Sequence, residues 1–276
     1  MRILTKADYD SAVLEWEKFK QNQDDLEIVL PKNSIFNVYS ENIEWLKERN
    51  NNSEFCAEIG IYNQQVILIT IPLDEDGRAV AIEEYPYCIL ELLQNNLEFV
   101  EVESSMTVKK TVLSTNFEEI SNESEVINSV INEPLIDKEL AISILQLWQT
   151  EGYNWLDAEK KENGGVNIFE KFYVPSVPIL SSENEINFVS AFALRYSEIY
   201  KKELPTLLFI STSRIEQVLS FETISNTYDY AKPCPPICKI PGTGTGTGTG
   251  TGSGSGSSGT GTSGGGSGSG SGGGGW

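Results

Sequence analysis

The chain has 276 residues, no histidine, and 40 acidic against 20 basic residues, which gives a formal net charge of −20. A surface this acidic repels phosphate backbones and anionic lipid headgroups, so the composition argues against binding to nucleic acid or to a membrane surface. No run of about 18 apolar residues occurs, so no transmembrane helix is predicted. The charge indicates a well-solvated surface or, alternatively, an acidic face for a basic partner.

The absence of histidine restricts the chemistry that an active site could use. It excludes a Ser-His-Asp triad, a Cys-His pair and an H-E-x-x-H zinc site. An enzyme would have to work with paired carboxylates, an activated lysine, or a cysteine without imidazole help. No cofactor is indicated by any motif, and the sequence leans away from an enzyme.

The N-terminal residues 1–10 contain no apolar core behind their basic residues, so they do not predict a signal peptide. We therefore expect the chain to be cytoplasmic as synthesised, with leaderless export as an alternative. The first predicted element is a helix. Thr5 and Asp8 form a weak capping box, and Tyr9, Val13 and Trp16 then recur on one face.

The remaining elements are predicted from periodicity and turn residues. In the first half we expect a strand at 26–30, a helix at 42–49, a hairpin of strands 55–62 and 66–73, a third strand at 78–83, and paired strands at 97–103 and 106–114. In the second half we expect helices at 124–132, 137–150, 186–202 and 214–221, a polar loop at 153–165, an extended segment at 169–180 and a strand at 206–211. The segment 85–94 fits no pattern.

This mixture predicts an α+β fold with a mixed, largely antiparallel sheet and several helices. The predicted organisation has three parts. They are an acidic globular body at 1–231, a Pro/Cys neck at 232–241, and a Gly/Thr/Ser-rich tail at 242–276 that ends in tryptophan. If the body contains two subdomains, their boundary should lie near 115–132.

One acidic cluster is a weak candidate for a metal site. Asp74, Asp76, Gly77 and Glu83 match positions of a calcium-binding EF-hand loop, but the first position is Pro72, which has no side-chain oxygen. The flanks also read as strands, whereas an EF-hand needs helices. The competing interpretation is an Asp-Gly hairpin turn, which the pattern favours.

Cysteines mark the end of the body. Cys234 and Cys238 could close a small disulfide loop, remain free thiols in a rigid neck, or take part in metal or redox chemistry. Cys56 and Cys88 lie in apolar segments and are predicted to be buried thiols.

Two further segments are weaker candidates. Residues 211–214 follow an apolar strand and could cap a helix or hold an anion at its N-terminus. The pair Gly164 and Gly165 lacks the other glycines of a nucleotide-binding motif, so a turn is predicted there.

The tail consists only of Gly, Thr and Ser from Gly242 to Gly275, with strict Gly-Thr alternation over 242–252. It has no apolar side chain to offset the entropy of ordering its backbone. It could act as a flexible tether or, with glycine on one face of an extended strand, stack against other copies. Its glycine runs could instead form polyproline-II-like helices that bundle with those of other copies. An engineered linker is a further alternative. Trp276 is its only aromatic anchor and a candidate docking residue for a partner.

The sequence resembles no known family, so function is inferred from these features alone. We expect a non-catalytic interaction or structural assembly protein, whose body packs on a protein partner or on itself and whose tail tethers or multimerises. One alternative is an enzyme that uses carboxylate or cysteine chemistry without histidine. Another is a secreted or delivered factor with a functional tail.

Overall fold

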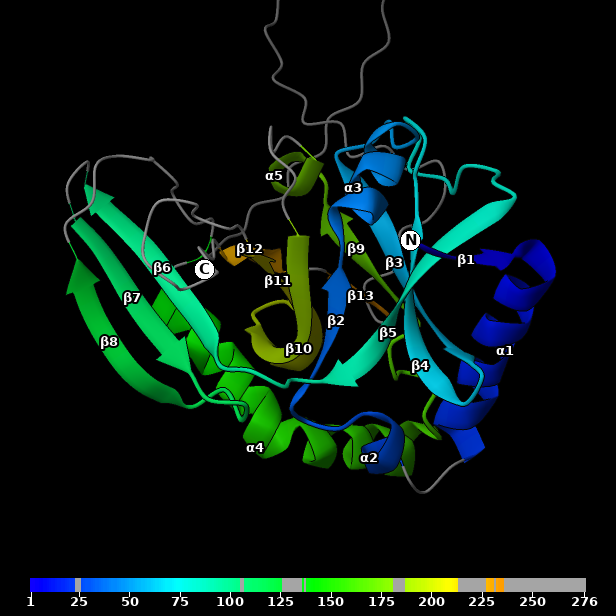
Figure 1. The fold of residues 1–276 in the computed structure, drawn as a ribbon. Helices are drawn as coiled ribbons and strands as arrows, with labels where there is room; N and C mark the ends of the chain where they lie inside the picture. Colours follow the sequence, from blue (N-terminus) through cyan, green and yellow to red (C-terminus); the bar gives the residue numbers. More distant parts are fainter. Residues whose placement is uncertain are drawn as a thin grey trace, which may run out of the picture. The chain divides into compact units, whose positions relative to one another are not determined.

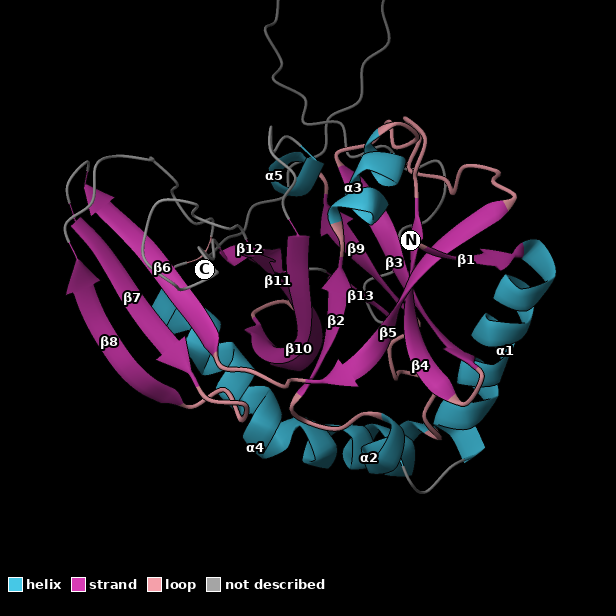
Figure 2. Cartoon of the chain, in the orientation of Figure 1, coloured by secondary structure: helices cyan, strands magenta, loops and turns pink. Residues whose placement is uncertain are grey.

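The computed structural model describes residues 1–22, 26–104, 107–125, 136, 138–180, 187–212, 227–230 and 232–235. Residues 1–243 form one compact unit. Its helices are α1 (Lys6–Asn22), α2 (Leu26–Val29), α3 (Ser40–Lys47), α4 (Lys138–Asn163) and α5 (Val177–Leu180). Figures 1 and 2 show that the helices lie around a centre built from strands.

The strands form two sheets. The larger one has the order β12-β11-β10-β2-β5-β4-β3-β9-β13, with β1 paired to β5 beside this path, and the smaller one has the order β6-β7-β8. Their bounds are β1 Arg2–Thr5, β2 Ser34–Val38, β3 Glu54–Tyr62, β4 Gln65–Ile71, β5 Glu84–Leu92, β6 Leu97–Ser104, β7 Thr107–Leu113, β8 Glu119–Glu125, β9 Lys171–Pro175, β10 Asn187–Ser197, β11 Lys202–Thr212, β12 Thr227–Tyr230 and β13 Lys232–Cys234.

Every pairing between the described strands is antiparallel. The predicted α+β fold with a largely antiparallel sheet is therefore confirmed. The large sheet also curls, because β12 pairs with β11 at one end while β13 pairs with β9 at the other. Since β12 and β13 are almost consecutive in the chain, they bring the two ends of the sheet close together.

The inner face of the curled sheet carries an aromatic core. Phe169 lies 5.2 Å from Phe192, ring centroid to centroid, and Trp148 of α4 stacks on Phe192 at 5.3 Å. Trp16 of α1 also reaches this cluster, and its indole nitrogen donates to the Phe169 carbonyl over 2.8 Å. These side chains are almost fully buried, so aromatic packing from both long helices closes the inside of the sheet.

The outer face of the sheet is covered by two separate elements. Helix α1 packs on the side of β3, β4 and β5, where Ala12, Ile67 and Ile69 are buried. Helix α4 and residues of the smaller sheet pack on the side of β10 and β11, where Val189 and Leu208 are buried. The strands under these two covers therefore have apolar residues on both faces.

That burial explains the largest error of the sequence prediction. Residues 186–202 were predicted to form a helix, but 187–197 form strand β10. Val189 belongs to the outer cluster and Phe192 to the inner one, so they lie on opposite faces. An apolar run that is buried on both faces carries no period of two, and its residues matched a helical spacing by coincidence.

Four other predicted elements differ from the structure. The strand at 26–30 is helix α2, because Leu30 donates its N–H to the Leu26 carbonyl over 2.9 Å and both side chains are buried on one face. The third strand is β5 at 84–92, and 78–83 contributes only a bridge between Leu73 and Ala79. The polar loop at 153–165 is mostly the end of α4. The extended segment at 169–180 ends in helix α5.

Other predictions agree with the structure or fall outside it. The first helix, the helix near 42–49, the hairpin of β3 and β4, the pair β6 and β7, the start of α4 and the strand near 206–211 are confirmed. Strands β1, β2, β8, β12 and β13 were missed, and β8 takes the place of the first residues of the helix expected at 124–132. The rest of that helix and the whole helix at 214–221 lie outside the described residues.

Candidate functional site

The acidic cluster predicted near residue 74 lies in the connection between β4 and β5. The Asp74 carboxylate accepts N–H bonds from Asp76, at 3.0 Å, and from Arg78, at 2.8 Å. Gly77 has φ of +77°, and Asp76 forms an ion pair with Arg78 over 3.2 Å. Glu83 borders a different surface hollow, beside Trp45 and Arg49. Within the described ranges, no three Asp, Glu or Cys side chains gather in a way that would hold a metal ion.

The other predicted site residues are placed as follows. Cys234 is disulfide-bonded, whereas Cys56 and Cys88 are buried thiols, as predicted for them. Cys238 and Trp276 lie outside the described residues, so the pairing of Cys234 with Cys238 stays a prediction, as does docking by Trp276. Of the segment 211–214, the first two residues end β11 and the rest is not described.

The glycine pair forms the predicted turn after α4. Gly164 has φ of +62° and Gly165 has φ of +77°. Gly165 packs under the end of α1, where the Lys20 ammonium donates to the Ile168 carbonyl over 3.1 Å and pairs with the Glu170 carboxylate. The turn therefore anchors α1 and has a structural role.

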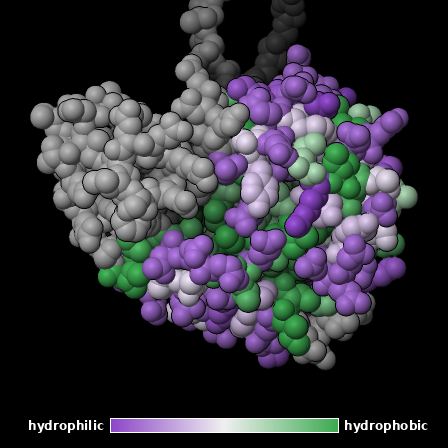
Figure 3. All heavy atoms as spheres, in the orientation of Figure 1, coloured by the Kyte–Doolittle hydropathy of each residue, from purple (hydrophilic) through white to green (hydrophobic). Residues whose placement is uncertain are grey.

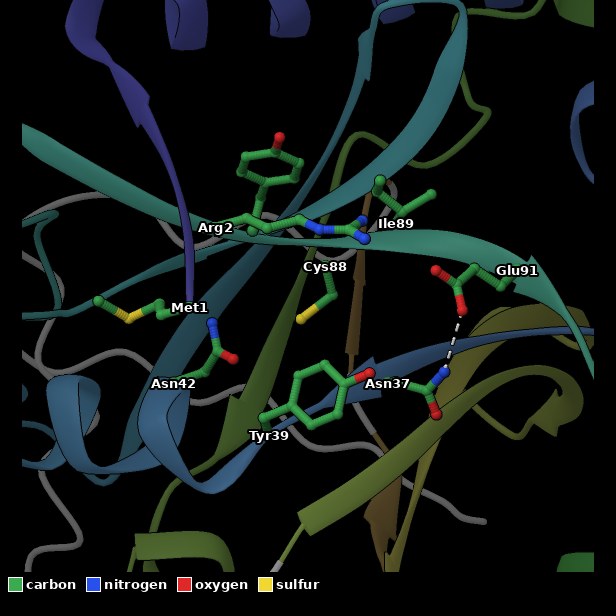
Figure 4. Close-up of a pocket in the computed structure, with 9 residues that line it drawn as sticks. Met1, Arg2, Asn37, Tyr39, Asn42, Cys88, Ile89 and Glu91 are labelled. Carbon is green, nitrogen blue, oxygen red and sulfur yellow. Dashed lines mark hydrogen bonds between the residues drawn. The ribbon is translucent and has the colours of Figure 1, made fainter.

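A cavity that the sequence did not indicate lies where strand β5 changes partners. Along the edge opposite β4, β5 pairs first with β1, through Tyr87 and Arg2, and then with β2, through Leu90 and Phe36. Cys88 and Ile89 fall between these two partners. The gap is a cavity of about 170 Å³, hereafter the fork cavity, drawn in Figure 4. Its lining comprises Met1, Arg2, Asn37, Tyr39, Asn42, Tyr87, Cys88, Ile89 and Glu91.

Helix α3 supplies the most unusual group of the fork cavity. Asn42 lies in the first turn of α3, is only 1% exposed, and its side-chain Nδ2 has no hydrogen-bond partner. A buried N–H donor without an acceptor is costly and rare. Tyr39, the N-cap residue of the same helix, is 54% exposed and forms part of the rim.

Strands β1 and β5 bring opposite charges to the same cavity. Arg2 comes from β1 and Glu91 from β5, where the Glu91 carboxylate accepts a 3.3 Å hydrogen bond from the Asn37 amide. Burial raises the pKa of the Cys88 thiol to about 12, while the charge of Arg2 acts to lower it and that of Glu91 to raise it. The thiol is therefore neutral and unreactive at pH 7.

A second polar cluster lies under α1. The Tyr9 hydroxyl donates to the Glu58 carboxylate over 2.7 Å, and the Tyr9 ring stacks on Tyr85 with 4.1 Å between centroids. Burial raises the pKa of Tyr9 and of Glu58 above their ordinary values. A phenol held in this way is a fixed hydrogen-bond donor rather than a base, so the cluster holds α1 on β3.

The hairpin between β10 and β11 exposes large apolar side chains. Ile199 is 84% exposed, Tyr196 46% and Tyr200 41%, and these three residues are hereafter the hairpin tip. The tip is stiff, because Lys201 donates its N–H to the Ser197 carbonyl over 2.7 Å and eleven residue pairs join the two strands. On the face drawn in Figure 3, hydrophilic residues dominate and hydrophobic ones form smaller patches between them.

Comparison with family models, with curated proteins and with solved structures found no match for this chain. None of the helices that the structure describes is both long and apolar enough to span a lipid bilayer.

Neither the hairpin tip nor the fork cavity was predicted from the sequence. The hairpin tip was expected inside a helix, and β5 fitted no pattern. One signal was present, because Tyr196, Ile199 and Tyr200 lie among the charged residues Arg195, Glu198, Lys201 and Lys202, which follow the apolar run 188–194.

Proposed function

We propose that this chain is a non-catalytic assembly protein, in which the compact body packs on another copy and the tail joins copies together. The hairpin tip carries this proposal. Tyrosine and other large side chains are enriched among the residues that dominate protein interfaces, and a stiff hairpin presents them with little loss of entropy on binding.

The tail supports the same proposal through its composition. The compact unit ends at Thr243, and the Gly/Thr/Ser composition begins at Gly242. The tail therefore adds no apolar surface to the body until Trp276. An alternating Gly-Thr sequence suits close stacking of extended copies, with glycine on one face.

The two parts act together in this proposal. Tails that join copies raise the effective concentration of one body near another, to the millimolar range for short flexible linkers. A weak contact through the hairpin tip is then sufficient to order the bodies. A second copy of the chain is accordingly the partner that we assign to the tip.

The experiment measures the mass of the full chain by light scattering over a dilution series. Ile199→Asp places a charge at the hairpin tip, and Val166→Asp is the matched control, because Val166 is also an exposed apolar residue, at 56%, but lies in the turn after α4. We expect Ile199→Asp to dissociate at about ten-fold higher concentration or more, as for a central interface residue. Equal dissociation of the two variants would refute the role of the tip.

A further inference from the structure

The fork cavity is not used by the proposed assembly, and its lining indicates a ligand. Figure 4 shows the Asn42 amide and the Cys88 thiol pointing toward the same space, with Arg2 and Glu91 on the side where β5 continues. The lining thus combines one cation, one anion and a buried amide whose N–H lacks an acceptor. Sites for small molecules are recognised by such a few convergent polar groups between apolar walls.

The charge balance selects the kind of molecule. A simple anion would be attracted by Arg2 but repelled by Glu91. A simple cation would be attracted by Glu91 but repelled by Arg2. The Met1 nitrogen is paired with the Glu41 carboxylate, so it does not upset this balance. A molecule that carries both charges close together satisfies both groups. Its anionic oxygens could also accept the unpartnered N–H bond of Asn42, near the positive N-terminal end of α3.

The volume admits a small molecule. A cavity with about 170 Å³ of accessible space holds several water molecules, because about 10–15 Å³ of such space is enough for one. The lining also includes the apolar side chains of Met1 and Ile89 and the ring of Tyr87. Space therefore remains beside the polar groups for a small apolar side group.

We propose that the fork cavity binds a small free α-amino acid such as alanine. Its carboxylate meets the Arg2 guanidinium and the Asn42 amide N–H, its ammonium group meets the Glu91 carboxylate, and its side chain faces Ile89 and Tyr87. The neutral Cys88 thiol forms part of the floor and takes no part in chemistry.

Calorimetric titration of the full chain with alanine tests this proposal. Lactate replaces the ammonium group by a hydroxyl group, and alaninamide removes the negative charge of the carboxylate, so the two compounds test Glu91 and Arg2 separately. Each lost charge-assisted hydrogen bond should weaken binding about ten-fold or more. We therefore expect alanine to bind more tightly than both analogues.

Variants of the lining residues test whether alanine binds in the fork cavity. Arg2→Met and Glu91→Gln change exposed side chains and should each weaken alanine binding about ten-fold or more. Arg78→Gln, in the turn between β4 and β5, is the control and should bind like the unaltered chain. Asn42→Ala removes the amide N–H donor and should also weaken alanine binding. No heat of binding with alanine, glycine or serine would overturn the proposal, as would lactate binding as tightly as alanine or unchanged affinity in Arg2→Met and Glu91→Gln.

Discussion

The turn after α4 allows a sharp test of how α1 is held to the body. A Cβ atom added at Gly165 would lie 2.3 Å from the carbonyl oxygen of Lys20 and 3.1 Å from its carbonyl carbon. Both are backbone atoms, so neither can move away by changing a rotamer. Gly164, the adjacent residue, also has a positive φ, but a Cβ atom there would meet nothing within 4 Å.

Alanine substitutions at Gly164 and Gly165 separate the cost of backbone strain from the cost of steric overlap. Gly164→Ala should cost only the strain of a left-handed alanine, about 1–2 kcal/mol of unfolding free energy. Gly165→Ala adds overpacking of about 1–3 kcal/mol, for a total of about 2–5 kcal/mol. The added part arises because α1 must shift, which weakens the Lys20 contacts with Ile168 and Glu170.

The assay is urea denaturation of both variants, followed by tryptophan fluorescence. Trp16 of α1 is fully buried and is one of five tryptophans, so exposure of these side chains on unfolding changes the emission. We expect Gly165→Ala to have a clearly lower midpoint than Gly164→Ala. Equal midpoints would refute the close approach of the turn to α1.

Other predictions concern charge and the aromatic core. Burial raises the pKa of Glu159, but hydrogen bonds led by that from Lys202 outweigh burial, so the pKa lies below its ordinary value of 4.5. Glu159→Gln should therefore lower the melting temperature at pH 7, and the loss should shrink as the pH falls below about 4.5. For Glu58, burial raises the pKa above 4.5, so Glu58→Gln should raise the melting temperature at pH 7, and this gain should fade as the pH falls through the raised pKa and be absent below about pH 4.5. Phe192→Ala, in the centre of the aromatic core, should cost about 3–5 kcal/mol in urea denaturation.

The sequence predicted elements well where one face of a strand or helix stays polar or a turn is marked. The hairpin of β3 and β4 was found because Asn63 and Gln64 separate two strongly apolar strands, and both adopt positive φ. Helix α1 was found because polar residues fill its outer face. These are local properties of the chain.

The errors arose where tertiary packing decides the structure. Strand β10 is covered on both faces, and the short apolar run of α2 has no length to distinguish a turn of helix from a strand. The fork cavity depends on β1 and β2 sharing one edge of β5, which brings Arg2, Asn42 and Cys88 together from distant segments. No local pattern predicts such a meeting.

The proposed role of the tail, to join copies of the compact body, is tested most directly by light-scattering mass. The full chain is compared with a version that ends at Thr243, the last residue of the compact unit. Far-ultraviolet circular dichroism shows whether the shorter version keeps its helices and strands. We expect a multimer for the full chain and fewer subunits for the version without the tail. The same number of subunits in both would contradict it.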